Sequence, residues 1–306
     1  ESGSMPYGQA GYHGQKMKFP FPAQFIAEGV DQTRGWFYSL LVLGVGLFDK
    51  SPYENVIVNG LILAEDGQKM SKRLNNYPDL NLTINKYGAD ALRFYLLSSP
   101  AVRAEDFSFS ERGLGEVTRR VIMRLKNVLA FYQLYAPVEP LPRPTVKGSA
   151  DLLDRWIESR LHQLNQAVSQ AFETYELDRL GQPLDLFIDD LSTWYLRRSR
   201  ERLKTLEQEI QIDALQTLHQ TLMTLAKIIA PIMPFLAEEI HQALRQEDDQ
   251  KSVHLETWPI LGKIDSDLLT QMAEGRRLAS LALEARAKAG IKVRQPLAKL
   301  KLKTKN

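Results

Sequence analysis

Two lysines three positions apart, Lys69 and Lys72, are the residues whose type and spacing best suit chemistry. They lie in the stretch GQKMSKR at residues 67–73. Compact charges on flexible stems in a glycine-preceded loop could converge on a polyphosphate, and Ser71 between them adds a hydroxyl donor. In nucleotidyl transfer, negative charge develops around the α-phosphorus, so such cations would act by positioning and electrostatic stabilisation. A solvated basic turn is the commoner interpretation of such a string when it stands alone.

The sequence before this loop predicts strands and a helix that could place the lysines at a ligand-binding site. Residues 24–29 are short, apolar and alternating, which indicates a strand, and residues 55–63 are rich in β-branched side chains, which indicates another. Between them, apolar residues recur at helical spacing up to residue 48, with Asp31 or Thr33 as the expected N-cap. Strand, helix and strand with short connections predict a right-handed βαβ unit. Parallel sheets bind ligands at the carboxyl ends of their strands, where the lysine pair begins.

The second half of the chain has a helical pattern. Helices are expected over residues 83–98 and 111–134, and a proline-rich stretch then predicts a domain boundary near residue 145. Beyond it, four amphipathic segments predict an antiparallel bundle. A long helix over residues 265–289 should end at Gly290, and the alternating basic tail after it is expected to form a strand.

Composition excludes several classes of site. The chain has no cysteine, so it can form neither a disulfide nor a thiolate metal site. Its five histidines lie far apart without the spacing of a metal-binding motif, so no metal site is expected in this chain. The longest apolar run is too short to span a bilayer, so we expect no membrane association and a cytoplasmic location. Although the net charge is only +2, basic clusters at residues 196–204 and 287–306 could contact phosphates.

The loop and its surroundings resemble a known family. KMSKR resembles KMSKS, the second signature of class I aminoacyl-tRNA synthetases, with Arg73 in place of the last serine. EGVDQTRGWF at residues 28–37 resembles the segment that precedes KMSKS in the isoleucine enzymes. The valine and leucine enzymes have different residues in that segment. NNYPD, followed by KYGADALRFYLLSSPAVRAEDFSF, is similar to the eukaryote-type branch of isoleucyl-tRNA synthetases.

The resemblance extends over essentially the whole chain. ESGSMPYGQ at the start resembles the stretch where that family re-enters its catalytic domain after the editing insertion. WYLRRSRER, APIMPFLAEEI and GIKVRQPL resemble the family's anticodon-binding domain and the segment after it. The chain therefore resembles the C-terminal portion of an isoleucyl-tRNA synthetase.

This resemblance implies a fold class of α/β plus all-α. Residues 1–110 would form the C-terminal half of a Rossmann-like parallel-sheet catalytic domain with the KMSKS-type loop, and residues 111–145 a connecting helix and proline-rich linker. Residues 146–260 would form a helical-bundle anticodon-binding domain, and residues 261–306 a C-terminal helix and basic tail. The HIGH signature is absent from these 306 residues. We therefore expect the missing N-terminal half of the synthetase as a partner and no aminoacyl-adenylate formation by this chain alone.

The resemblance also implies roles for particular residues. Glu28 would lie beside the substrate ammonium or ribose, and Gly29 would let the backbone approach the adenylate closely. Asp31 and Gln32 are candidates for polar contacts to the same ligand, with a plain N-cap as the alternative for Asp31. The other implied contacts are to ATP, with Mg²⁺ accompanying it: Asn59 and Gly60 to adenine, and Lys69, Met70, Ser71, Lys72 and Arg73 to the phosphates.

For the tRNA, the resemblance points to the arginines of the basic cluster at residues 196–204. Some would contact the RNA backbone while others form salt bridges within the bundle; they are Arg197, Arg198, Arg200 and Arg202. Trp194 and Tyr195 could stack on bases, but their helical spacing favours burial in the core.

The expected function is part of isoleucine–tRNA ligation, with isoleucine, ATP and tRNA(Ile) as substrates. Three alternatives remain open on the sequence. The chain could be a non-catalytic tRNA-binding module derived from a synthetase, or a fragment of a valyl- or leucyl-type synthetase. It could also be another nucleotidyltransferase with a similar lysine loop, although the C-terminal half would then have no explanation.

Overall fold

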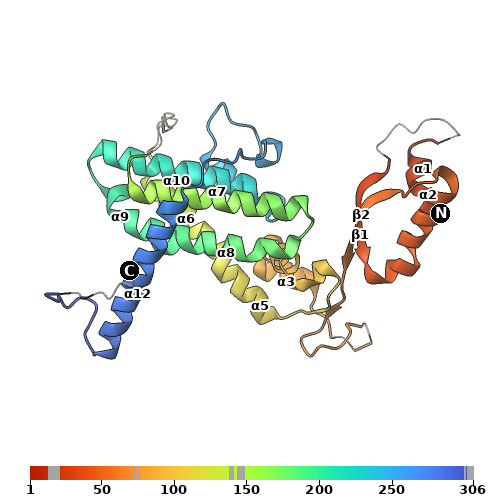
Figure 1. Ribbon diagram of the computed structural model, residues 1–306, viewed down its shortest axis with the longest axis horizontal. Helices are drawn as coiled ribbons and strands as arrows, with labels where there is room; N and C mark the ends of the chain where they lie inside the picture. The colour runs from red at the N-terminus through yellow and green to blue at the C-terminus, as the bar shows by residue number, and fades with distance from the viewer. Residues whose placement is uncertain are drawn as a thin grey trace.

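The structure is a computed structural model that describes residues 1–12, 21–71, 73–74, 76–137, 141–142, 149–299 and 301. Figure 1 shows a lobe of two strands and short helices standing apart from a larger helical body, with a long helix projecting from the far side of that body. We call the first part the strand lobe. It contains α1 (Met5–Gln9), β1 (Ala23–Gly29), α2 (Trp36–Phe48) and β2 (Tyr53–Asn59).

The expected βαβ unit is present in the strand lobe. β1 and β2 pair in parallel, with Gly29 opposite Asn59 at their carboxyl ends. The core of the lobe is small: Ile26, Phe37 and Leu40 are its buried members. Neither Asp31 nor Thr33 caps α2, because residues Val30–Arg34 form a 3₁₀ turn and the helix begins only after Gly35.

The second predicted strand, residues 55–63, is interrupted. β2 ends at Asn59, and β3 (Ile62–Leu63) pairs instead with β4 (Phe107–Ser108) in a separate parallel sheet. The interruption lies at Gly60, whose N–H donates to the carbonyl of Ala101. A Cβ at Gly60 would lie 2.0 Å from the carbonyl oxygen of Glu105. The chain can therefore cross between the two sheets only with glycine there.

The predicted helix over residues 83–98 is also two elements. α3 (Leu80–Tyr87) and α4 (Ala89–Leu97) meet at Gly88, whose φ of +85° ends one helix and redirects the chain into the next. Asp79 caps α3 by accepting a hydrogen bond from the N–H of Leu82.

The remaining helices form the body of the molecule. Those in the first half of the body are α5 (Glu111–Val117), the π-helical turn Thr118–Ile122, α6 (Met123–Tyr135), α7 (Leu152–Glu173), α8 (Gly181–Asp189), the π-helical turn Asp190–Tyr195 and α9 (Leu196–Lys204). Those in the second half are α10 (Gln208–Ile229), α11 (Pro234–Leu244), the 3₁₀ turn Val253–Leu255 and α12 (Ser266–Lys288). The predicted bundle is present; the predicted boundary near residue 145 lies outside the described residues.

One hydrophobic core joins the bundle to the helices that follow the lysine loop. Phe94 of α4 and Leu114 of α5 belong to the same buried cluster as Trp156, Phe187 and Leu222 of the bundle. Full burial of side chains of this size stabilises a fold by about 1.5–3 kcal/mol each. The loop's surroundings are therefore anchored to the bundle.

The C-terminal tail differs from expectation. α12 ends at Gly290 as predicted, with φ of +68° there. Residues 291–299 form turns instead of a strand. The guanidinium of Arg286 donates to the carbonyls of Lys292, Val293 and Gln295, which folds the tail back on α12. Within the described residues, no helix is long and apolar enough to cross a bilayer.

Candidate functional site

The candidate ligand residues of the sheet come together at the carboxyl ends of β1 and β2. Glu28 lies opposite Val58, and Gly29 opposite Asn59, which Gly60 follows directly. The Glu28 side chain is exposed. An exposed carboxylate beside a glycine and an amide can accept hydrogen bonds from an ammonium or a hydroxyl at the sheet edge.

Asp31 and Gln32 follow in the 3₁₀ turn. The Nε2 of Gln32 donates to the Oδ2 of Asp31 at 3.0 Å, and its Oε1 accepts from the N–H of Trp36 at 2.8 Å. Gln32 thus satisfies a free N–H at the start of α2, the role expected of Asp31. Asp31 is left with its carboxylate exposed beside Glu28.

The lysine loop, residues 64–76, begins with a tight turn. The N–H of Ala64 donates to the carbonyl of Gln68 at 2.9 Å, and Gly67 takes a φ of +78° within the turn. Lys69 then bridges back to Leu63 through its backbone, with its side chain exposed. Met70 packs against the main core, which fixes the base of the loop.

Asn76 organises the middle of this loop. Its Oδ1 accepts from the N–H of Ser71 at 2.9 Å, and its Nδ2 donates to the carbonyl of Lys69 at 3.3 Å. The hydroxyl of Ser71 accepts from the N–H of Leu74. Sequence reasoning missed Asn76, although it stands in the NNYPD string. Arg73 is exposed, and Lys72 lies outside the described residues.

A second candidate site lies on α9, which Figure 1 shows at the opposite end of the molecule from the strand lobe. Arg197, Arg200 and Lys204 are exposed and lie on one helical face, because they are spaced by three and four residues. We call them the cationic stripe. Among the described residues, none of the three has an ion-pair partner.

Aromatic rings of α6 lie beneath the cationic stripe. The guanidinium of Arg200 lies 5.4 Å from the ring centroid of Phe131, and the ammonium of Lys204 lies 6.0 Å from that of Tyr135. Cations over aromatic faces are held in place without losing their charge. Lys204 was missed in the sequence, although its spacing from Arg200 was the available signal.

Arg198 lies on a different face, where it stacks on Trp194. Its guanidinium is 4.4 Å from the indole, and Arg276 of α12 lies 5.1 Å from the same ring. Trp194 is only partly buried, whereas Tyr195 is completely buried. The burial expected for these two aromatics therefore holds fully for Tyr195.

Arg202 forms a salt bridge within the bundle, which was the second role expected for arginines of the basic cluster at residues 196–204. Its guanidinium donates to both carboxylate oxygens of Asp154, at 3.0 and 2.7 Å. The Tyr195 hydroxyl donates to the same carboxylate at 2.8 Å. Asp154 is fully buried. Burial, followed by the charge of Asp154, raises the pKa of Tyr195 well above its ordinary value, so Tyr195 stays a donor.

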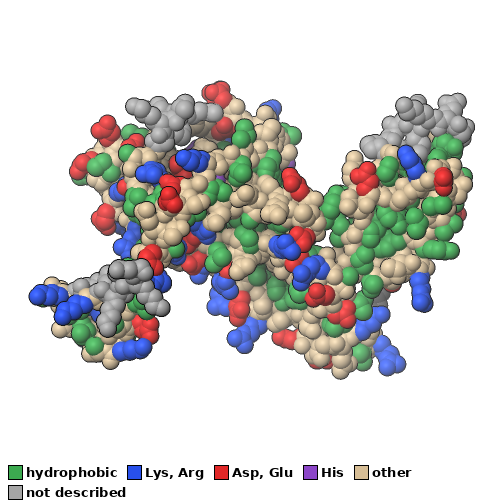
Figure 2. Space-filling view, in the orientation of Figure 1, with side chains coloured by type: hydrophobic (Ala, Val, Ile, Leu, Met, Phe, Trp, Pro, Cys, Tyr) green, Lys and Arg blue, Asp and Glu red, His purple; other side chains and the backbone are tan. Residues whose placement is uncertain are grey.

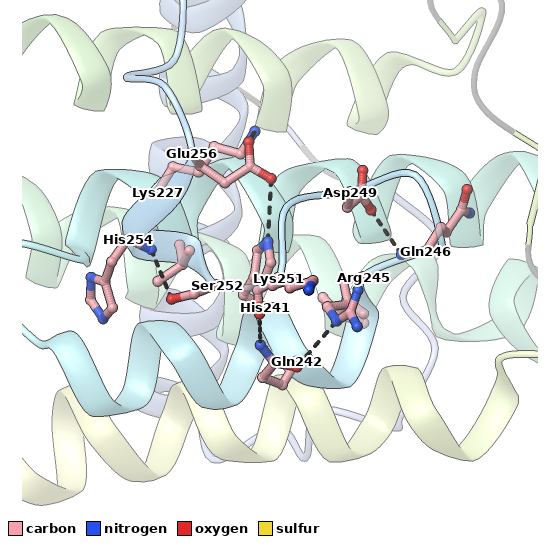
Figure 3. A network of polar contacts seen from close by, with 12 residues as sticks. Lys227, His241, Gln242, Arg245, Gln246, Asp249, Lys251, Ser252, His254 and Glu256 are labelled. Atoms are coloured by element: carbon pink, nitrogen blue, oxygen red, sulfur yellow. Dashed lines mark hydrogen bonds and ion pairs between the residues drawn. The ribbon is translucent and has the colours of Figure 1, made fainter.

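Two further carboxylates fasten the segment after α11 to the bundle, and Figure 3 shows one of them, Glu256. Glu256 accepts from the Nζ of Lys227 at 3.0 Å and lies 3.3 Å from the Nε2 of His241. Glu238 accepts from the hydroxyl of Ser252 and from the N–H of Val253, both at 2.9 Å. Burial alone would raise the pKa of both carboxyls, but these hydrogen bonds outweigh it and the pKa of each is lowered.

A cavity of about 420 Å³ lies beside α10. Its lining includes Gln216, His219 and Lys227. In the part of the chain that the structure describes, no group of three or more His, Asp or Glu side chains is arranged to hold a metal ion.

The sheet, loop and bundle match known families in that order. Residues 1–108 match the family of class I tRNA synthetases (I, L, M and V), and residues 154–302 match the anticodon-binding domain of tRNA ligases. Together these matches cover most of the chain: a match to the class I synthetases is followed by a match to the anticodon-binding domain.

Among individual proteins, the chain is similar to isoleucine–tRNA ligases, as its sequence predicted. It is 46% identical over 304 residues to isoleucine–tRNA ligase of Chlamydia trachomatis serovar D, and 46% identical over 306 residues to that of Chlamydia muridarum. In both cases the match covers 97% of this chain and 29% of the relative. The chain therefore spans less than a third of the length of these proteins.

A solved structure shares the fold. The chain aligns with a leucyl-tRNA synthetase of Agrobacterium radiobacter K84, crystallised with tRNA and a leucyl-adenylate analogue, with a TM-score of 0.59 and 18% identity. The alignment covers 81% of this chain and 29% of the other. At this identity the likeness describes the fold alone.

Proposed function

We propose that this chain is the part of an isoleucine–tRNA ligase that supplies the KMSKS-type phosphate loop and the anticodon-binding domain. In the complete reaction, the carboxylate of isoleucine attacks the α-phosphorus of ATP and pyrophosphate leaves. The isoleucyl group then passes to tRNA(Ile), with release of AMP. The similarity to isoleucine–tRNA ligases over 97% of the chain is the observation that carries this proposal. We assign the activity to the cytoplasm, where translation consumes charged tRNA.

The sheet end would bind the adenylate. Glu28 and Asp31 present carboxylates for the substrate ammonium or the ribose, and Gln32 is held beside them. Asn59 and Gly60 would present polar and backbone groups to adenine. The parallel pairing supports this assignment, because it brings the ends of β1 and β2 to one edge of the sheet.

The lysine loop would bind the phosphates of ATP. Lys69 is exposed and available, and Arg73 adds a second exposed cation. Lys72 is proposed as the main phosphate ligand on the resemblance to the second lysine of KMSKS. Met70 would anchor the loop, and Ser71 would shape it through its hydrogen bonds with Asn76 and Leu74. Mg²⁺ would arrive with ATP and neutralise charge on the phosphates.

The strand lobe would be completed by the rest of a class I catalytic domain. Within the described residues, the sheet of the strand lobe has only two strands. Both β1 and α2 also carry exposed hydrophobic side chains, including Phe25, Tyr38 and Val42. Hydrophobic side chains gather over this lobe in Figure 2. Parallel sheets normally have both faces covered, so further strands and helices are expected to pack here.

The bundle would bind tRNA(Ile) through the cationic stripe and Arg198. Three exposed cations in line can follow a phosphate backbone, and the partly buried Trp194 can stack on an unpaired base. Arg202 would contribute indirectly, because its guanidinium already holds the buried Asp154. A non-catalytic tRNA-binding module remains the second candidate, since the bundle has a large core of its own whereas the strand lobe has not.

ATP–pyrophosphate exchange tests the proposal. The chain should be assayed alone and mixed with a polypeptide that carries the HIGH signature and the rest of the catalytic domain. We expect isoleucine-dependent exchange from the mixture only. Lys69→Ala and Lys72→Ala should each lower kcat about a hundredfold. Lys288→Ala, which removes an exposed lysine paired with Glu284, is the matched control. Absence of exchange in a folded, verified complex would favour the binding module.

A further inference from the structure

Two segments that carry the family resemblance have no part in the chemistry proposed so far. One is ADALRF, which forms the first two thirds of α4, and the other is APIMPFLAEEI, which forms the turn between α10 and α11 and most of α11. They are separated by more than a hundred residues in sequence, but they meet in the structure. Their contact joins the region of the lysine loop to the anticodon-binding bundle.

Asp90 of α4 caps the N-terminus of α11. Its Oδ2 accepts from the N–H of Leu236 at 2.6 Å, and its Oδ1 from the N–H of Phe235 at 3.4 Å. α11 has no side-chain cap of its own, and its first residue, Pro234, has no N–H to satisfy. Asp90 therefore takes the free donors at the positive end of a helix that belongs to another part of the chain.

Arg93, one turn further along α4, binds the other side of the same turn. Its Nε donates to the carbonyl of Ile232 and its Nη2 to that of Pro231, both at 3.0 Å. These carbonyls directly follow α10, whose C-terminal end is negative. An acid and a base three residues apart thus match the opposite charges of two helix ends. We call this pair the α4 clamp.

The opposite side of α4 faces the base of the lysine loop. Tyr95 packs edge-on against Phe107 and Phe109 and accepts a hydrogen bond from the N–H of Ser110. The Ser110 hydroxyl donates to Glu65, which lies in the first turn of the loop. β4, which contains Phe107, pairs with β3, the strand that enters the loop.

α4 is therefore a single rigid element between the α10–α11 turn and the lysine loop. The strand lobe has its own small core, whereas Met70 and Ile62 at the loop base pack against the core shared with the bundle. The position of the loop relative to the bundle consequently depends on how α4 is held.

We infer that Asp90 and Arg93 are positioning residues that set the lysine loop against the anticodon-binding bundle. They touch no substrate; they act through α4, Tyr95 and the β3–β4 pair. This inference rests on the proposed function for its catalytic consequence, but its mechanical part is a property of the chain itself. The two parts can be tested separately.

The mechanical part is tested by amide hydrogen exchange on the full chain. In Asp90→Asn and in Arg93→Lys, we expect exchange at residues 62–71 and at the start of α11 to accelerate about tenfold, because a charge-assisted hydrogen bond is lost or misaligned. Exchange in α7 should not change. Glu116→Gln and Arg112→Lys, which alter an exposed ion pair on α5, are the controls. Unchanged exchange at residues 62–71 in both clamp variants would overturn the inference.

The catalytic part is tested in the ligase assembled from this chain and the HIGH-bearing polypeptide. We expect kcat for ATP–pyrophosphate exchange to fall about tenfold in both clamp variants, with KM for isoleucine and Kd for tRNA within about twofold of wild type. Altered loop exchange with wild-type kcat would overturn the positioning role. Inactivity of the wild-type assembly would instead count against the proposed function, and hydrogen exchange would still decide the mechanical part.

Discussion

At the scale of single residues, the arginines of one short helix divide between two tasks. Arg202 is 20% exposed and paired with a fully buried carboxylate, whereas Arg197 is exposed and unpaired within the described residues. The sequence offered both RNA contacts and salt bridges for these arginines, but it could not identify Asp154, 48 residues away, as the partner of Arg202. The side chains that surround α9 decide which arginines remain available at the surface.

Arg202→Met should lower the free energy of unfolding by about 3–5 kcal/mol, because the fully buried carboxyl group of Asp154 would lose its counterion. Chemical denaturation followed by circular dichroism measures this change. Arg197→Met should alter stability by less than about 0.5 kcal/mol while weakening RNA binding. Equal stability losses in the two variants would contradict this division of roles.

Gly60 lies so close to the backbone of Glu105 that a larger residue does not fit there. Gly60→Ala should destabilise the protein by about 1–3 kcal/mol, since the added methyl would overlap the backbone of Glu105. Gly46→Ala, in the last turn of α2 with nothing within 4 Å, is the matched control and should be neutral or slightly stabilising. Thermal melts of both variants test the prediction; a Gly60→Ala protein that melts like wild type would refute it.

At the scale of elements, periodicity predicted the helices and the parallel pair but not where they break. The strand expected through residue 63 ends at Asn59 because Glu105 crowds Gly60, a contact between residues 45 apart in sequence. The helix expected over residues 83–98 bends at Gly88, whose positive φ has no counterpart in the hydrophobic pattern. The α4 clamp was equally invisible, because its partners are backbone groups of a distant turn.

The segment Val253–Leu255 should detach from the bundle in acid. The pKa values of Glu238 and Glu256 lie below their ordinary value of 4.5 in the folded protein. Their contribution to stability is therefore complete above that ordinary value and is lost as the pH falls through the lowered pKa values. The protection factors of the amides at residues 252–256, corrected for the intrinsic pH dependence of hydrogen exchange, should fall between about pH 5 and pH 3.

Glu256→Gln supplies the control for this acid effect. The amide cannot titrate, so the protection factors at residues 252–256 should depend less on pH in this variant than in wild type. Lys227 and His241 are the cationic or titratable groups that face Glu256 from α10 and α11. If wild type and variant respond to acid in the same way, other groups control the segment.

At the scale of the whole molecule, the chain contains two cores of very different size. Among the described residues, the buried hydrophobic cluster of the strand lobe contains three members, and the lobe's exposed apolar side chains are visible in Figure 2. The other core extends continuously from α4 to α12. The order of motifs in the sequence predicted a catalytic part followed by a helical part, but it did not predict that the lysine loop would be anchored to the helical part.

We expect the strand lobe to unfold before the bundle. With so little buried surface, β1 and α2 should lose amide protection at lower urea concentrations than α7 and α10, giving two transitions. Native-state hydrogen exchange in a urea series measures this order. Adding the HIGH-bearing polypeptide should raise the urea midpoint of the first transition and leave that of the second unchanged. A single cooperative transition would show that the two cores are energetically coupled.

The π-helical turn Asp190–Tyr195 determines the directions in which the side chains of α9 point around the helix axis. A π turn holds about one residue more than an α turn, and one residue corresponds to about 100° of rotation about the helix axis. α8 and α9 can therefore both bury apolar faces in one bundle, with the cationic stripe outward. Deleting Ser192 would restore a uniform helix and rotate Arg197, Arg200 and Lys204 out of line with the α6 aromatics, without removing a single charge.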